Sequence, residues 1–66
     1  MPSAQQSAEE IAELLKERAI CEAARNWEEA DVCQAEIDVE LERLRAMVGP
    51  EEAEEMVRAA EYGWLS

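Results

Sequence analysis

The sequence has no histidine and no phenylalanine, and it has only two glycines, two prolines and two cysteines. Histidine is the commonest general base and metal ligand, so most familiar catalytic and metal sites are excluded. No serine stands near a base, and no glycine-rich phosphate loop or EF-hand loop is present. The carboxylates fall on helix faces that are expected to be solvated. We therefore expect a non-enzymatic protein without cofactor, metal or catalytic residue.

Basic residues are also scarce, since six Lys and Arg stand against seventeen Asp and Glu, for a net charge of −11. DNA, RNA and anionic membranes bind clustered Lys and Arg, so direct binding to them is not expected. No run approaches the roughly 20 apolar residues of a membrane span. The first seven residues, MPSAQQS, lack the basic and apolar regions of a secretory signal. These features favour a cytoplasmic location.

Helical periodicity predicts an all-α fold, a small bundle made of an antiparallel helical hairpin and a short third helix. The expected helices cover about residues 8–25, 27–48 and 51–62, within one helical domain over residues 8–66. Ser7 and Glu10 form a capping-box pattern at the first helix, so residues 1–7 are expected to be a flexible leader. Gly49-Pro50 separates the second and third helices, and Gly63 is expected to end the third.

The turn of the hairpin is expected near Asn26, which can cap the helix that follows. That helix carries a heptad seam interrupted only by Gln34, and on the preceding helix Arg18 and Glu22 interrupt the apolar face. Folding back near residue 26 pairs apolar residues along the hairpin: Ala23 with Ala30, Leu15 with Ile37, Ile11 with Leu41, and Ala8 with Leu44. The aromatic residues Trp27, Tyr62 and Trp64 are expected to anchor the core, with partner docking as the alternative role of Trp64.

Residues 24–37, ARNWEEADVCQAEI, locally resemble two known helical hairpins. One lies in the C-terminal tail of cysteinyl-tRNA synthetases, and the other is the UVR-type hairpin of bacterial excision-repair proteins. The resemblance includes a basic turn, an aromatic residue and a following Ala-Asp. The Arg-Asp pair usual in both families is absent, and Cys33-Gln34 stands there instead. The resemblance implies a hairpin, and no functional residue is carried over from it.

Acidic residues follow both flanks of the second helix in rows, and the first helix adds Glu10, Glu13 and Glu17. Such rows can imitate a nucleic-acid backbone, so we expect an inhibitor or regulator that covers the basic surface of a partner protein, as phage-encoded nucleic-acid mimics do. The candidate partner-binding residues are Glu29, Asp31, Glu36, Asp38, Glu40, Glu42 and Trp64. The simpler interpretation is that the rows only keep the protein in solution.

The alternative function is structural, namely a self-assembling coiled coil or helical bundle. The second helix has a weaker apolar stripe formed by Val32, Ala35, Val39 and Ala46. A helix with two stripes must contact two neighbours, which are either the third helix or a second copy of the chain. A homodimer is the expected oligomer.

Cys21 and Cys33 are expected to face each other across the hairpin near its turn. Two explanations stay open for them, a pair of reduced thiols packed in the core and a redox pair. Facing helices lie about 8–10 Å apart, which is too far for an unstrained disulfide.

Overall fold

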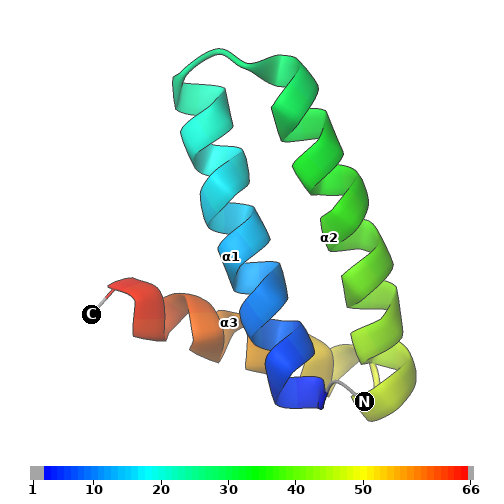
Figure 1. Cartoon of the computed structure of the whole chain (residues 1–66). Coiled ribbons are helices and arrows are strands. Elements are labelled where there is room, and N and C mark those ends of the chain that lie inside the picture. The colour runs from blue at the N-terminus through cyan, green and yellow to red at the C-terminus, as the bar shows by residue number, and fades with distance from the viewer. Residues whose placement is uncertain (1–2, 66) are drawn as a thin grey trace.

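A computed structural model describes residues 3–65 of the chain, with side chains described for residues 3–62. Three helices are present, α1 (Ala4–Ala23), α2 (Trp27–Val48) and α3 (Pro50–Leu65). No strand occurs within the described range, which confirms the all-α prediction. The helices α1 and α2 form an antiparallel hairpin, and α3 crosses it near the end that lies away from the turn (Figure 1).

The prediction that α1 starts at about residue 8 is wrong, because Ser3 rather than Ser7 caps the helix. The Ser3 hydroxyl accepts from the backbone N–H of Gln6 at 3.2 Å, and the Gln6 side chain accepts from the Ser3 N–H at 3.1 Å. This is a capping box with Gln in place of Glu. Ser7 lies in the first turns of α1 and is buried. Residues 3–7 are therefore ordered, and the rest of the expected leader, residues 1–2, lies outside the described residues.

The turn of the hairpin is a Schellman motif, followed directly by the N-cap of α2. The N–H of Asn26 donates to the carbonyl of Cys21 at 2.8 Å, and the N–H of Arg25 donates to Glu22 at 3.0 Å. Arg25 sits in the left-handed region, at φ 60°. The Asn26 side chain then accepts from the N–H of Glu29. The two caps end α1 and start α2 within three residues, which confirms the predicted turn.

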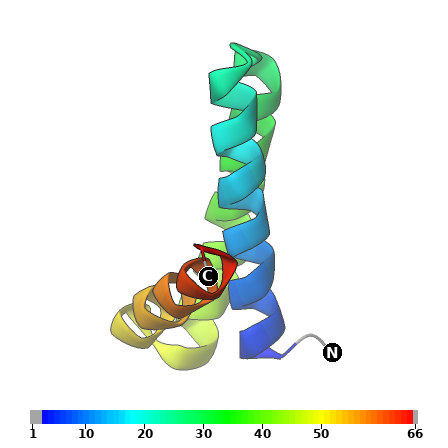
Figure 2. The same cartoon turned by 90° about the vertical axis from the view of Figure 1, so that its left-hand side faces the viewer.

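The core lies where the three helices meet, and it contains Ala8, Ile11, Ile37, Leu44 and Ala53. The predicted apolar pairs of the hairpin supply four of these five residues, and Leu15, Leu41 and Val48 pack at the margin of the core. Ala53 brings α3 onto one face of the hairpin, and Figure 2 shows that the opposite face is left uncovered.

The aromatic residues and the end of α3 differ from what the sequence predicts. Trp27 and Tyr62 are not core anchors, since their exposed fractions are 59% and 75%. Trp27 is the first residue of α2, where it has no facing helix to pack against. Gly63 does not end α3, which continues to Leu65. The side chain of Trp64 lies outside the described residues.

Replacing Arg25 with glycine should stabilise the protein, because glycine occupies the left-handed region without the steric cost that arginine bears. We expect Arg25→Gly to raise the free energy of unfolding by about 0.5–1 kcal/mol. Urea denaturation followed by circular dichroism measures the change. Arg25→Ala is the matched control and should change stability little, because it removes the side chain and keeps the strain. Equal stabilisation by both variants would show that the side chain, not the backbone, is responsible.

Candidate protein-binding site

The uncovered face of the hairpin carries a groove between α1 and α2, hereafter the open groove. It has a volume of about 510 Å³. Its lining residues are Glu10, Glu13, Leu14 and Glu17 from α1, and Ala35, Glu36, Val39 and Glu40 from α2. Five of these eight residues are glutamates and three are apolar, while none is basic. We call Glu10, Glu13 and Glu17 the α1 rim of the groove and Glu36 and Glu40 its α2 rim. Leu14 and Glu40 are partly buried, whereas Ala35 and Val39 are exposed.

The α3 side of the hairpin differs in its charge. A crevice of about 290 Å³ there, hereafter the mixed crevice, is shared by all three helices. Three acids and three bases line it, namely Asp38, Glu54, Glu61, Arg18, Arg45 and Arg58. Opposite charges at this density largely cancel one another. The lining of the open groove is thus uniformly acidic where that of the mixed crevice is balanced.

The structure separates the predicted partner-binding residues into two sets. Glu36 and Glu40 line the open groove beside the α1 glutamates, and Glu29 lies on the same flank of α2. The set Asp31, Asp38 and Glu42 follows the other flank, and Asp38 lines the mixed crevice. All of these side chains are exposed except that of Glu40, which is partly buried and pairs with Arg43 at 3.2 Å.

Leu14 and Val39 form the part of the site that sequence reasoning missed. The sequence places Val39 in the second apolar stripe of α2, and α3 or a second copy of the chain is the expected cover for that stripe. The structure leaves Val32, Ala35, Val39 and Ala46 exposed. The sequence does hold a signal for this site, because Glu36 and Glu40 directly follow Ala35 and Val39 of the stripe.

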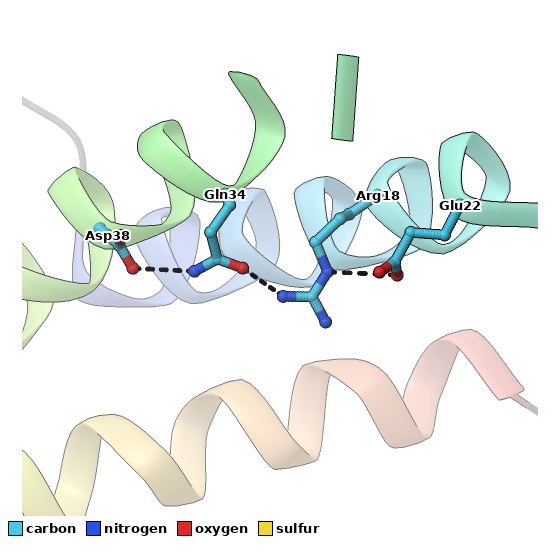
Figure 3. A network of polar contacts seen from close by, with 4 residues as sticks. All are labelled: Arg18, Glu22, Gln34 and Asp38. Carbon is cyan, nitrogen blue, oxygen red and sulfur yellow. Dashed lines mark hydrogen bonds and ion pairs between the residues drawn. The ribbon is translucent and has the colours of Figure 1, made fainter. Parts of the chain in front are cut away.

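A polar network joins the two helices of the hairpin on its α3 side (Figure 3). The Arg18 guanidinium donates to the Gln34 side-chain carbonyl, and the Gln34 amide donates to Asp38 at 2.9 Å. Glu22 lies 3.7 Å from the Nε of Arg18. Arg18 and Gln34 were the residues that interrupted the two apolar seams. Because the interruptions face each other, the Arg18 guanidinium and the Gln34 amide bond to each other, while the buried Nε of Arg18 makes no hydrogen bond and has only the Glu22 carboxylate 3.7 Å away.

Cys21 and Cys33 do meet across the hairpin, and both are free thiols. Burial is the main cause that raises the pKa of Cys33. Smaller contributions come from the charges of Cys21, Glu17 and Glu29 and from a side-chain hydrogen bond with Cys21. The thiolate is the form that attacks disulfides and oxidants, so this environment disfavours reactivity. The redox role of the pair remains a prediction.

Within the described part of the chain, no group of three or more Cys, Asp or Glu residues is placed to hold a metal ion. None of the described helices combines the length and apolarity needed to cross a membrane. Comparisons with protein-family models, curated proteins and solved structures find no match to this chain.

A double-mutant cycle should show that Arg18 and Gln34 stabilise the fold together. We expect Arg18→Leu and Gln34→Leu each to lower the free energy of unfolding by about 1–2 kcal/mol, because each leaves a partly buried polar group without its partner. The double variant should recover most of the loss, giving a coupling of about 1 kcal/mol or more. Arg43→Ala, which removes a mostly exposed guanidinium from its ion pair with Glu40, should change stability by less than about 0.5 kcal/mol. Additive effects of the two leucine substitutions would contradict the coupling.

The Cys33 thiol should react slowly in the folded protein. Iodoacetamide alkylation, mapped by mass spectrometry on the two cysteine peptides, should modify Cys33 several-fold more slowly in the native state than in urea. The raised pKa of Cys33 also predicts a pH dependence. The contribution of this thiol to the free energy of unfolding is fully present below the pKa of the unfolded state, and it is lost as pH rises through the higher pKa of the folded state. Cys33→Ala should lack this alkaline component. Equal alkylation rates in the folded and unfolded states would contradict the burial argument.

Proposed function

We propose that this protein is a small acidic protein-binding module that covers a basic, nucleic-acid-binding surface of a partner, and so acts as an inhibitor or regulator. The observation that carries the proposal is the open groove, where two antiparallel helices bring five glutamates together, none of the described lining residues is basic, and only Glu40 pairs with an arginine beside the groove. A cationic partner would be attracted to this face over long range and oriented by it.

The spacing of the glutamates supports the comparison with nucleic acid. Glu10, Glu13 and Glu17 recur every three or four residues, which is about 4.5–6 Å along a helix. The facing helices, whose axes lie about 8–10 Å apart in such packing, provide a second row. Two parallel rows of negative charge beside a groove are what a basic element meets on double-stranded DNA, whose grooves are about 6 and 12 Å wide.

The exposed stripe on α2 favours the second candidate, self-assembly into a dimer or larger bundle. Val32 and Val39 remain uncovered, and burying them would be favourable. The acidic residues on either side of the stripe oppose this, because two copies would bring their glutamates together. A basic partner satisfies both the apolar and the charged parts of the face.

Reversing the charge of one flank of α2 tests the proposal. The variant Glu29→Lys, Glu36→Lys, Glu40→Lys alters the open groove and its flank. The matched control, Asp31→Lys, Asp38→Lys, Glu42→Lys, makes the same change in net charge on the other flank. Affinity capture from an extract of the native host, at about 0.1 and 0.5 M salt, compares both variants with the wild type. Circular dichroism confirms that both remain helical.

We expect the first variant to weaken capture roughly 10- to 100-fold, while the control retains most of it. The captured protein should be released at the higher salt concentration and displaced by duplex DNA or RNA. Capture that survives both high salt and reversal of the first flank would contradict the proposal. Salt-resistant oligomers of the chain itself, seen by light scattering, would favour self-assembly instead.

A further inference from the structure

We propose that the open groove binds a basic amphipathic helix of the partner protein. The apolar stripe of that helix would pack on Leu14 and Val39, and its Lys and Arg residues would pair with glutamates on both rims. This inference rests on the proposed function and adds the chemistry and the shape of the occupant.

The apolar residues of the groove lining require an apolar stripe on the occupant. Val39 is 53% exposed, and Leu14 is half-buried at the base of the groove. Val32 precedes Val39 by two helical turns, so it extends the same apolar surface towards the turn of the hairpin. A purely ionic occupant, such as an extended Lys-rich segment, would leave these side chains in water. Burying one valine improves affinity by about tenfold or more.

The rims require bases on both sides of that stripe. Glu10, Glu13 and Glu17 line the α1 side, while Glu36 and Glu40 line the α2 side. On a single helix, an apolar stripe flanked by Lys and Arg on both edges matches this arrangement. From Glu10 to Glu17 the rim covers about 10 Å, or two turns of a bound helix. Many DNA-binding proteins place a basic helix in a groove of DNA. Covering such a helix would block nucleic-acid binding, as the proposed function requires.

Two other occupants fit the groove poorly. A second copy of the chain carries the same charge of −11 and borders its exposed stripe with acids, so its docking would oppose glutamate to glutamate. The helix α3 is held on the opposite face, where Ala53 is fully buried in the core. The charge of the rims therefore selects a basic partner.

Two synthetic peptides test the occupant directly. One is a helix of about 18 Leu and Lys residues with all its leucines on one stripe, and the other has the same composition scrambled so that no stripe forms. Fluorescence anisotropy at about 0.1 M salt measures their binding to the full chain. We expect the striped peptide to bind about tenfold more tightly. Val39→Ser should weaken the striped peptide about fivefold and leave the scrambled one unchanged.

The control for Val39→Ser is Tyr62→Ser, which removes an exposed ring on α3 and should change the affinity of neither peptide. Equal binding of both peptides, with Val39→Ser silent, would overturn the groove inference. The acidic-face function would still stand in that case if reversal of Glu29, Glu36 and Glu40 weakened both peptides. If that reversal weakened neither peptide, the proposed function would fail as well. A dimer that the striped peptide dissociates, observed by sedimentation, would place a second copy in the groove and overturn the basic occupant.

Discussion

The antiparallel contact between α1 and α2 determines which side chains of this chain become neighbours. The contact follows from the three residues between the helices, where a Schellman motif ends α1 and the Asn26 side chain caps α2. Both helices carry acidic residues beside their apolar faces. When these faces pack together, Glu10, Glu13 and Glu17 lie across the groove from Glu36 and Glu40. A continuous helix would leave the same residues in one long row without a groove. The open groove is thus a consequence of the turn.

Arg18 and Gln34 add specificity to a seam that is otherwise rich in alanine. Small apolar residues pack acceptably in more than one register, whereas a polar pair within the seam is satisfied in only one. A shift by one turn would leave the guanidinium and the amide without partners, at a cost comparable to a large part of the stability of so small a domain. Asp38 holds the far end of the network at 2.9 Å from Gln34. This interaction removes Asp38 from the uniformly acidic face and makes the two flanks of α2 unequal.

The sequence was sufficient to predict the three helices, the turn and the four core residues that the hairpin supplies, because each has a local signal. Asn26 is a good N-cap, Gly49 adopts φ 93° where α2 ends, and the seam repeats by three and four residues. The start of α1 was misplaced because Ser3-Gln6 and Ser7-Glu10 are equivalent patterns, and only packing shows that Ser7 is buried. The helical periodicity also places Trp27 in line with the apolar seam of α2. It does not show that the first residue of α2 has no helix opposite it, and Trp27 is exposed. The difference between the two acidic flanks depends on where α3 docks, which no local pattern specifies.

Gathering five glutamates around the open groove has an energetic consequence. Like charges held on facing helices repel each other, and the repulsion acts against a core with few large side chains. The mixed crevice avoids this through its three arginines, but none of the described residues that line the open groove is basic. A cation bound there would relieve the repulsion and cover Val39 at the same time. Whatever binds the folded hairpin and not the unfolded chain also stabilises it by mass action. Like-charge repulsion in the groove opposes folding, so the basic partner proposed above would stabilise the hairpin through the same surface.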